Sequence, residues 1–337
     1  AQDRFAPEFP GAEENKALIS RKLTDAPLHV QADIPEWTIP SFEANFSDEW
    51  VEEAIAFSRR PSLDLRVNTL KSSAEKLLKQ LSRTGAKPCA IARQGLRIQS
   101  DKPFDRQPNV QAEEAFQKGR FEIQDEGSQI VADLVFAKPG ETVLDLCAGA
   151  GGKALALAAT MENRGQIHAY DIDKARLAPI HERLKRAGTR NVQVHAPDAD
   201  LSGLNGKMDR VIVDAPCTGT GTWRRRPDAK WRLDTGNLEA RIEQQERVLA
   251  DAAPFVRTGG HLVYITCSIL PEENENQVYA FVEDHPEFEI VSAGEVWEEL
   301  FGYDKPAPWS SDMKTVTLTP ASTDTDGFFF AVLERKA

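Results

Sequence analysis

From about Phe121 onward, short apolar runs alternate with longer segments in which apolar residues recur every three to four positions. The apolar runs predict strands at Thr142–Leu146, Gln166–Tyr170, Asn191–His195, Arg210–Asp214, His261–Thr266 and Gly327–Leu333. The segments between them predict helices at Gly152–Ala159, Lys174–Ala187 and Leu238–Val256. Such alternation is typical of an α/β fold with a mostly parallel sheet that is covered on both faces.

The chain before residue 121 follows a different pattern. Residues 1–60 are rich in proline and aromatic side chains and contain one helix-like stretch that begins at Ser47, a favourable N-cap residue. The next segment predicts a strand at Leu63–Val67, a helix near Ala74–Arg83, and strands around Cys89–Ile91 and Leu96–Ile98. We therefore predict a partly helical N-terminal extension (1–60), a small α/β subdomain (61–120) and a larger α/β domain (121–337).

The composition limits the number of domains and the kinds of partner that the chain can have. The 337 residues, 41% of them hydrophobic, suffice for about two folded domains. The net charge of -12 argues against a surface covered with phosphate-binding residues. No apolar run approaches the roughly 18 residues of a membrane span. Because Ala1–Ala12 also lacks the layout of a signal peptide, we expect a cytoplasmic protein that does not bind membranes.

Cysteine and histidine spacing argues against a metal site. None of the four cysteines forms a Cys-x-x-Cys pair, so neither a disulfide framework nor a zinc site is expected. His168, His181 and His195 lack the spacing of metal ligands, and we interpret them as isolated structural or surface residues. The acidic stretch from Glu283 to Asp304 is interpreted as a solvated face.

A glycine-rich turn follows the first strand of the larger domain. It has the residues Cys147-Ala148-Gly149-Ala150-Gly151-Gly152-Lys153-Ala154. Glycines let the backbone approach a ligand, and the start of a helix offers free N–H groups. Asp171 ends the next strand, where a doubly wound sheet binds a ribose hydroxyl, so we predict an adenosine-type cofactor.

The same turn is compatible with other classes of protein. Gly149-x-Gly151-x-x-Ala154 also fits the dinucleotide fingerprint, which keeps an NAD or FAD enzyme open as an alternative. A phosphate-binding P-loop does not fit, since Cys147 stands in place of its first glycine and Ala154 in place of its Ser/Thr. A tight turn without a ligand is the simplest alternative.

Two cysteines follow later strands of the sheet. Cys217 comes three residues after Asp214, and Cys267 follows Thr266. Both should reach the edge that carries the glycine turn. A thiolate attacks electron-poor carbons. Thiolate addition to a pyrimidine ring lets the neighbouring carbon accept a methyl group, and Cys267, Asp214 and Cys217 could serve as nucleophile, ring-nitrogen partner and release group. Inert buried cysteines are the alternative.

A segment rich in cations and tryptophan comes directly after Cys217. Single-stranded or looped RNA is bound by phosphate contacts and by base stacking on such side chains. We therefore predict RNA contacts from Trp223, Arg224, Arg225, Arg226, Lys230 and Arg232. The alternative is a solvated basic loop.

Five stretches of the chain, in order, resemble the motifs of the RNA cytosine-5 methyltransferases of the RsmB/Sun family. They are FEIQDEGSQ (121–129), LDLCAGAGGKA (144–154), DAPCTGTGTWRRRPDAKWR (214–232), TCSILPEENENQV (266–278) and DGFFFAVL (326–333). The resemblance implies a Rossmann-like class I methyltransferase domain with a mostly parallel seven-stranded sheet, preceded by an RRM-like RNA-binding subdomain. It also implies S-adenosylmethionine as methyl donor, Cys267 as nucleophile and Cys217 as the thiol that releases product.

Matching by residue extends these implications. Cofactor contacts fall on Cys147, Ala148, Gly149, Ala150, Gly151, Gly152, Lys153, Asp171, Asp198 and Asp214. Asp214 would also face the base, and Lys153 would lie near cofactor and substrate as a further catalytic residue. The family's turn usually reads Ala-Ala-Pro-Gly-Gly-Lys-Thr. Gly149, Ala150 and Ala154 depart from that pattern, which bears on cofactor affinity.

The resemblance also bears on partners. It favours ribosomal RNA as substrate, with transfer RNA as an alternative, and we expect a monomer. Bacterial members often carry a NusB-like helical domain ahead of the catalytic part, and residues 1–60 are too few for it. Two further hypotheses are an NAD-linked oxidoreductase and a catalytically silent RNA-binding protein, although the first gives Cys217 and Cys267 no role.

Overall fold

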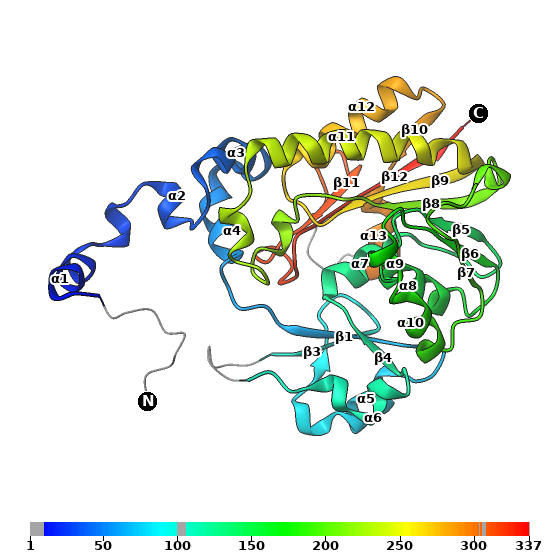
Figure 1. Cartoon of the computed structure of the whole chain (residues 1–337), viewed down its shortest axis with the longest axis horizontal. Coiled ribbons are helices and arrows are strands. Elements are labelled where there is room, and N and C mark those ends of the chain that lie inside the picture. Colours follow the sequence, from blue (N-terminus) through cyan, green and yellow to red (C-terminus); the bar gives the residue numbers. More distant parts are fainter. Residues whose placement is uncertain (1–9, 100–105, 303, 305–307, 337) are drawn as a thin grey trace.

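The computed structural model describes residues 10–99, 106–302, 304 and 308–336. In these residues the larger domain forms an eight-stranded sheet in the order β10-β12-β9-β8-β5-β6-β7, with β11 paired to β12 (Figure 1). The strands are β5 (Thr142–Asp145), β6 (Gln166–Ala169), β7 (Val192–Val194), β8 (Met208–Asp214), β9 (Val256–Thr266), β10 (Phe288–Val291), β11 (Thr315–Leu318) and β12 (Phe328–Arg335). Strands β5 to β9 run parallel, and β12 runs antiparallel to β9 and β10.

Helices cover both faces of this sheet, as its apolar strands require. One face packs on α7 (Glu126–Leu134), α8 (Gly152–Thr160), α9 (Lys174–Leu177), α10 (Ile180–Ala187) and α13 (Ala293–Phe301). The other face packs on α11 (Thr235–Ala252) and α12 (Glu275–Asp284). Successive strand residues alternate between the two cores; Val143 joins the first and Leu144 the second. The predicted Rossmann-like fold is confirmed, although the sheet in the described residues has eight strands where seven were expected, because β11 adds to it by pairing with β12.

The small domain has its own antiparallel sheet, in the order β2-β3-β1-β4. Its elements are β1 (Leu63–Val67), α5 (Ala74–Gln80), β2 (Lys87–Pro88), β3 (Gly95–Ile98), α6 (Glu114–Gln117) and β4 (Phe121–Ile123). Leu65, Leu77 and Phe121 lie in its core. Because β4 pairs with β1, this sheet continues three residues past the expected boundary at residue 120.

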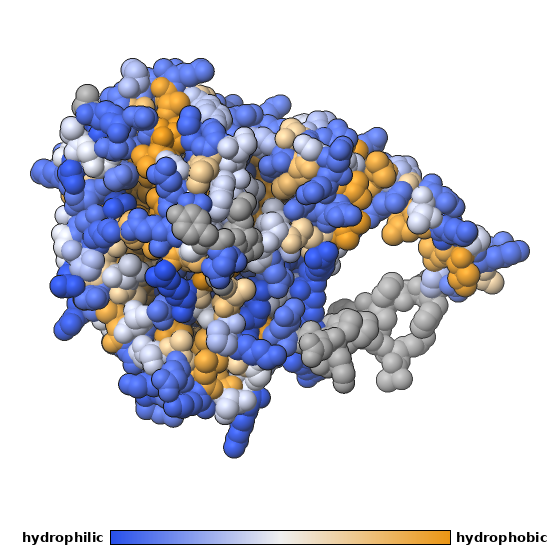
Figure 2. All heavy atoms as spheres, turned by 180° about the vertical axis from the view of Figure 1, so that it is seen from behind, coloured by the Kyte–Doolittle hydropathy of each residue, from blue (hydrophilic) through white to orange (hydrophobic). Residues whose placement is uncertain are grey.

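The N-terminal segment is helical. It contains α1 (Ala12–Ser20), α2 (Leu28–Gln31), α3 (Ile39–Phe46) and α4 (Trp50–Ala56). Its first part, with α1 and α2, extends away from the rest of the chain, whereas α3 and α4 lie against the larger domain (Figure 1). Helices α3 and α4 contribute Phe42 and Trp50 to a small core that also includes Trp223. Every residue of α1 is exposed, including the apolar Leu18 and Ile19. Figure 2 shows hydrophobic residues on the surface of this arm.

The acidic stretch from Glu283 to Asp304 is more than a solvated face. It contains β10 and α13, and Trp297 of α13 is fully buried against the sheet. The carboxylates occupy the outer side of an amphipathic helix, so the expectation from charge alone was wrong for the apolar half of the stretch.

Candidate active site

The carboxyl ends of four parallel strands carry the predicted site residues. The glycine turn follows β5, Asp171 follows β6, Asp214 ends β8, and Cys267 follows β9. Since β5, β6, β8 and β9 are neighbours in the sheet, these residues share one edge. Open α/β sheets bind their ligands at this edge.

The turn after β5 contains two left-handed glycines with different roles. Gly151 has a φ of 82°, and a Cβ there would lie 2.5 Å from the Ile180 side chain, so glycine lets α8 and α10 pack closely. Gly149 has a φ of 49°, and a Cβ there would lie 3.6 Å or more from Arg176. Gly149 therefore leaves room above the turn for a ligand.

Asp171 connects the tip of β6 to the turn. One carboxylate oxygen accepts the Gly149 N–H at 2.9 Å, and the other accepts the Asp173 N–H at 2.8 Å. A carboxylate oxygen has a second lone pair, so Asp171 can also accept a ribose hydroxyl. Helix α8 begins without a side-chain cap, which leaves its N–H groups for a carboxylate. These donors and acceptors fit the ribose and amino-acid parts of S-adenosylmethionine.

The other predicted cofactor residues differ in exposure. Ala148 is buried, Cys147 is half-buried, and Asp198 is exposed in the loop after β7. Burial, followed by the nearby carboxylates, raises the pKa of the Cys147 thiol. Asp145, which the sequence did not single out, ends β5 with a fully buried carboxyl group. Burial and the neighbouring Asp214 raise its pKa to about 7.

Cys217 and Cys267 face one another. Their Sγ atoms lie 3.3 Å apart, and both side chains are half-buried. The contact with Cys267, and then burial, raise the pKa of the Cys217 thiol. A protonated Cys217 can donate a weak hydrogen bond to the Cys267 sulfur. The predicted pair of thiols is therefore placed within one site.

Glu273 holds the Cys217 loop in place and was missed by sequence reasoning. Its buried carboxylate accepts the Thr218 N–H at 2.8 Å and the Thr218 hydroxyl. The Gln245 side chain donates to Glu273 and to the Pro216 carbonyl, each at 3.0 Å. Burial raises the pKa of Glu273. The signal available in the sequence was its position soon after Cys267.

Lys153 and Asp214 form an ion pair beside the thiols. The Lys153 ammonium lies 3.0 Å from an Asp214 carboxylate oxygen, and its side chain is 6% exposed against 32% for Asp214. The hydroxyl of Ser128 lies 3.2 Å from the same ammonium. The Asp214 carboxylate therefore lies on the solvent-accessible side of the site, and the Lys153 ammonium contacts it from the buried side. Ser128 was also missed by sequence reasoning.

A hollow of about 340 Å³ opens beside Cys217. It is lined by Cys217, Thr218 and residues at the start of α11 that include Asn237 and Arg241. Its volume falls in the range of small-ligand sites. The hollow reaches the site on the side of Cys217, and its lining does not include Cys267 or Asp214.

The prediction that the basic segment after Cys217 binds RNA does not hold for all of its residues. Trp223 is 1% exposed and stacks on Phe42 with ring centroids 6.1 Å apart, so its ring is not available to a base. Lys230 is buried and pairs with Asp33. These two side chains stabilise the protein itself, although the sequence predicted that they bind RNA.

Arg224 and Arg225 are also engaged within the protein. Arg224 is buried and pairs with Asp326 at 2.5 Å and with Asp125 at 3.2 Å. Arg225 pairs with the same two carboxylates and keeps part of its side chain exposed. Of the residues predicted to bind RNA, Arg226 and Arg232 are exposed, and Trp231 between them is 58% exposed. These three residues are the better candidates.

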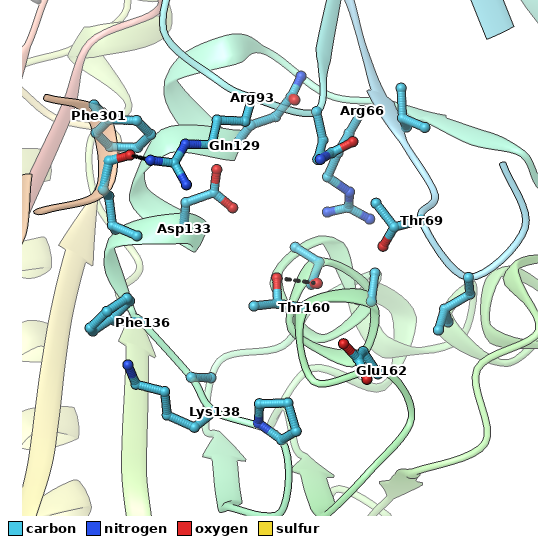
Figure 3. Close-up of a pocket in the computed structure, with 18 residues that line it drawn as sticks. Arg66, Thr69, Arg93, Gln129, Asp133, Phe136, Lys138, Thr160, Glu162 and Phe301 are labelled. Carbon is cyan, nitrogen blue, oxygen red and sulfur yellow. Dashed lines mark hydrogen bonds between the residues drawn. The ribbon is translucent and has the colours of Figure 1, made fainter. Parts of the chain in front are cut away.

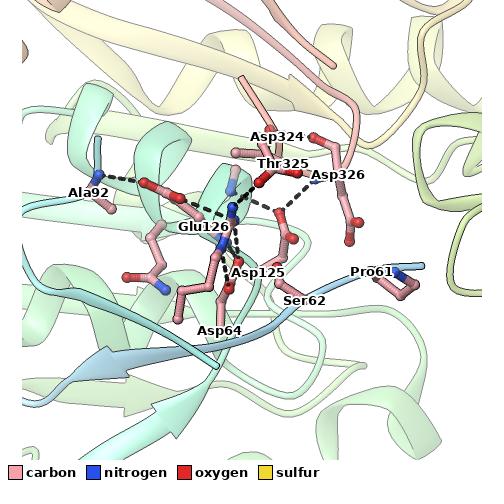
Figure 4. Close-up of polar contacts among 12 residues, drawn as sticks. Pro61, Ser62, Asp64, Ala92, Asp125, Glu126, Asp324, Thr325 and Asp326 are labelled. Carbon is pink, nitrogen blue, oxygen red and sulfur yellow. Dashed lines mark hydrogen bonds and ion pairs between the residues drawn. The ribbon is translucent and has the colours of Figure 1, made fainter. Parts of the chain in front are cut away.

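Asp125 and Asp326 belong to a cluster of carboxylates between the two domains (Figure 4). Arg97 of β3 pairs with Asp64 at 2.8 Å and with Glu126 at 3.1 Å. Glu126 in turn accepts the Ile91 and Ala92 N–H groups at 2.7 and 2.9 Å. The small domain is therefore attached close to the active site by buried charges.

A cavity of about 670 Å³ lies between the small domain and the helices α7, α8 and α13 (Figure 3). Arg66, Gln129 and Asp133 line it. Burial raises the pKa of Asp133 to about 6 and lowers that of Arg66 to about 10. The cavity lies at the carboxyl end of α8, whereas the glycine turn lies at its amino end. It is therefore distinct from the thiol site.

His168 and His195 are not isolated, because their ring nitrogens lie 2.9 Å apart across β6 and β7. The described residues contain no group of three or more His, Cys, Asp or Glu side chains placed to hold a metal ion. In the described ranges, every helix is too short or too polar to cross a membrane.

Comparison with known proteins gives consistent matches. The family model for 16S rRNA methyltransferase RsmB/F matches residues 133–334, and an RsmF/B-like ferredoxin-like domain matches residues 34–105. A probable ribosomal RNA small subunit methyltransferase B from Synechocystis is 31% identical over 331 residues, which are 96% of this chain and 71% of that protein.

Two solved structures extend the comparison. PH0851 is 31% identical with a TM-score of 0.80, covering 94% of this chain and 68% of that one. NSun6 from Pyrococcus horikoshii, solved with SFG, is 25% identical with a TM-score of 0.74, covering 90% of this chain and 98% of that one.

Proposed function

Because the chain belongs to the RsmB/F family and is therefore an S-adenosylmethionine-dependent methyltransferase, we propose that it methylates carbon 5 of a cytosine in ribosomal RNA. The ribosomal substrate rests on what the relatives are named for, with transfer RNA as the alternative. Family membership also removes the hypothesis of an NAD-linked oxidoreductase.

The pair of thiols carries this proposal. Two sulfur atoms 3.3 Å apart lie at the sheet edge that holds the glycine turn and Asp214. A methyltransferase that acts on a good nucleophile, such as an amine, does not require a thiol. A pyrimidine carbon does, because it becomes nucleophilic only after a thiolate has added to the neighbouring ring carbon.

The proposed chemistry assigns one role to each group. The Cys267 thiolate bonds to ring carbon 6, which makes carbon 5 nucleophilic, while Asp214 faces ring nitrogen 3. S-adenosylmethionine supplies the electrophilic methyl group. Water then accepts the carbon 5 proton, the electron pair of that C–H bond re-forms the double bond between carbons 5 and 6, and Cys267 leaves as a thiolate, a release that Cys217 assists. Lys153 holds one Asp214 oxygen and leaves the other for the base.

The RNA must present a base that can leave its stack. Flipping a base costs a few kcal/mol, which favours a loop or bulge as target. Arg226, Trp231 and Arg232 are exposed on the loop after Cys217 and supply phosphate and stacking contacts for such a strand.

A Cys217→Ala variant tests the proposal. Because it keeps the nucleophile and loses the release thiol, we expect a covalent protein–RNA adduct after incubation with S-adenosylmethionine and RNA from cells that lack cytosine-5 methylation. The adduct should appear as a retarded band on a denaturing gel. A matched Cys89→Ala variant, altered at a thiol of the small domain, should give no such band.

Two results would contradict the proposal. The first is a band that persists in the Cys217→Ala/Cys267→Ala double variant, since Cys267 would then not be the nucleophile. The second is transfer of labelled methyl groups by the wild type to a base other than cytosine, identified after nuclease digestion.

A further inference from the structure

A chain of hydrogen bonds runs from the small domain into the active site. It starts at Arg66 on β1, whose Nη1 donates to Gln124 Oε1 at 2.7 Å. Gln124 Nε2 donates to Ser128 Oγ at 2.9 Å. Lys153 Nζ donates to the same Ser128 oxygen at 3.2 Å and to Asp214 at 3.0 Å. Three residues therefore connect a domain that carries none of the proposed catalytic groups to the Lys153–Asp214 pair.

Arg66 fixes the direction of every bond in this chain. A guanidinium can only donate, so the oxygen of the Gln124 amide must face Arg66 and its N–H₂ must face Ser128. The Ser128 oxygen then accepts from Gln124 on one side and from the Lys153 ammonium on the other. Both lone pairs of this oxygen are used, so the Ser128 oxygen is held in an orientation in which it accepts from Lys153.

Arg66 is itself held firmly at the domain boundary. Its side chain is buried in the wall of the cavity between the domains, where Figure 3 shows it beside Thr69. Nη1 also donates to the Gly152 carbonyl at 2.9 Å, and Gly152 is the first residue of α8. The Gln124 backbone carbonyl accepts from the Gln129 amide at 2.9 Å. The same guanidinium therefore sets both the glycine turn and the direction of the chain.

We propose that Arg66, Gln124 and Ser128 are positioning residues that aim the Lys153 ammonium at Asp214. This inference rests on the proposed function, in which Asp214 faces the cytosine ring. Of the three N–H bonds of Lys153, one is used by Asp214 and one by Ser128. Without the Ser128 oxygen the ammonium can rotate away, and the Asp214 carboxylate loses the partner that keeps one of its oxygens turned from the base.

The test compares Ser128→Ala with Ser128→Thr, which keeps the hydroxyl. We expect Ser128→Ala to lower the single-turnover rate of methyl transfer by about tenfold, the effect of one charge-assisted hydrogen bond. KM for RNA, affinity for S-adenosylmethionine and the melting temperature should change little, and Ser128→Thr should restore most of the rate. A purely structural role would instead lower the melting temperature and leave the rate of the folded protein unchanged.

Gln124→Met provides a second, independent variant. It removes the middle of the chain while keeping a side chain of similar length, and we expect a smaller loss in rate than for Ser128→Ala. Because the chain acts as one unit, the double variant should be no slower than Ser128→Ala alone. Losses that multiply would overturn the inference, as would a Ser128→Ala enzyme as fast as the wild type. Failure of the proposed function is distinguishable, since the wild type itself would then leave cytosine unmethylated.

Discussion

Two carboxyl groups on neighbouring strands near the glycine turn, those of Asp145 and Asp214, differ in their exposure to solvent. Asp145 is 0% exposed, whereas the Asp214 side chain on the neighbouring strand is 32% exposed. Burial and the charge of Asp214 raise the pKa of Asp145 to about 7. One carboxyl group is therefore held in its protonated form up to about neutral pH, and the other is open to solvent.

The Asp145 carboxyl group should make stability depend on pH. An unfolded aspartate ionises near pH 4, whereas folded Asp145 ionises near pH 7. Between these values the folded state holds a proton that the unfolded chain has released, so the free energy of unfolding falls as pH rises, by about 1.4 kcal/mol per pH unit at most. We expect Asp145→Asn to remove roughly 2 kcal/mol of the difference between urea unfolding at pH 5 and at pH 8. An unchanged difference would contradict this.

Asp171 and Asp173 offer a matched pair for cofactor binding. Asp171 contacts the glycine turn, whereas Asp173 caps α9 through the Ala175 and Arg176 N–H groups. Loss of a carboxylate that accepts a ribose hydroxyl should weaken binding of S-adenosylmethionine by about tenfold or more. Calorimetric titration should show this for Asp171→Ala. Asp173→Ala should mainly cost about 1 kcal/mol of stability. Equal losses of affinity would contradict the assignment of Asp171.

For single residues, the sequence could predict which ones follow the ends of strands. The turn, Asp171, Asp214 and both thiols were found because the end of each strand is visible in its apolar run. Ser128 and Glu273 were missed, since their partners lie 25 and 55 residues away along the chain, and for Glu273 the only signal was its position soon after Cys267. Arg224 pairs with Asp326, which lies 102 residues further along the chain. Because this partner is so distant, nothing in the sequence indicated that Arg224 is buried, and it was predicted to be available to RNA.

At the scale of elements, the loop after Cys217 divides its cations between two tasks. Arg224, Arg225 and Lys230 bind carboxylates far away along the chain. Arg226 is exposed, and Arg232 is exposed in a surface ion pair with Asp228, 2.8 Å away, of the kind that contributes little to stability. The inward cations hold the loop in one conformation. The outward ones can then meet a phosphate backbone without first ordering the loop, which lowers the entropic cost of binding.

This division predicts how salt affects RNA binding. Each phosphate contact with single-stranded RNA contributes about 0.7 to the slope of log affinity against log salt. An Arg226→Ala/Arg232→Ala variant should therefore reduce the slope by about 1.4, measured by fluorescence anisotropy. The control is Arg257→Ala, at the opposite end of β9, where Arg257 pairs with Asp209. A slope that does not change in the double variant would remove the loop from the RNA interface.

Strands of the central sheet were easier to predict than peripheral elements. The apolar stretches Val143–Leu144 of β5, Val211–Val213 of β8 and Leu262–Ile265 of β9 are buried and mark these strands in the sequence. The expected helix over Lys174–Ala187 is interrupted at Pro179, which begins α10 as its N-cap. β10 and α13 were missed because their apolar residues alternate with carboxylates. The many charges led us to interpret the stretch as a solvated face, and the helical spacing of Trp297 and Phe301 was not recognised.

At the scale of the whole molecule, the two domains meet through backbone that lies unusually close. Gly119 precedes β4 with a φ of 67°, and a Cβ there would collide with the Arg186 carbonyl of α10. Asn68 reinforces this contact by donating to the carbonyls of Gly119 and Ala187, each at 2.8 Å. A methyl group at residue 119 would therefore not fit between the small domain and α10.

Gly119→Ala should separate the domains at this point. Left-handed strain and overpacking together should cost roughly 3 kcal/mol, and methyl transfer should fall because Arg66 shifts with the small domain. Gly85→Ala is the control, since Gly85 has a similar φ of 74° but open space around it. It should cost only about 1–2 kcal/mol and leave activity intact. Equal effects of the two variants in urea unfolding would show that the contact with α10 is unimportant.

The position of β12 has a consequence for how the enzyme is made. β12 lies between β9 and β10, although both are synthesised before it. A nascent chain therefore carries the glycine turn and both thiols while β9, which leads to Cys267, still has an open edge. Phe329 closes that edge opposite Thr266. Assembly of the active site is thus a late event, because the edge of β9 stays unpaired until β12 has been synthesised.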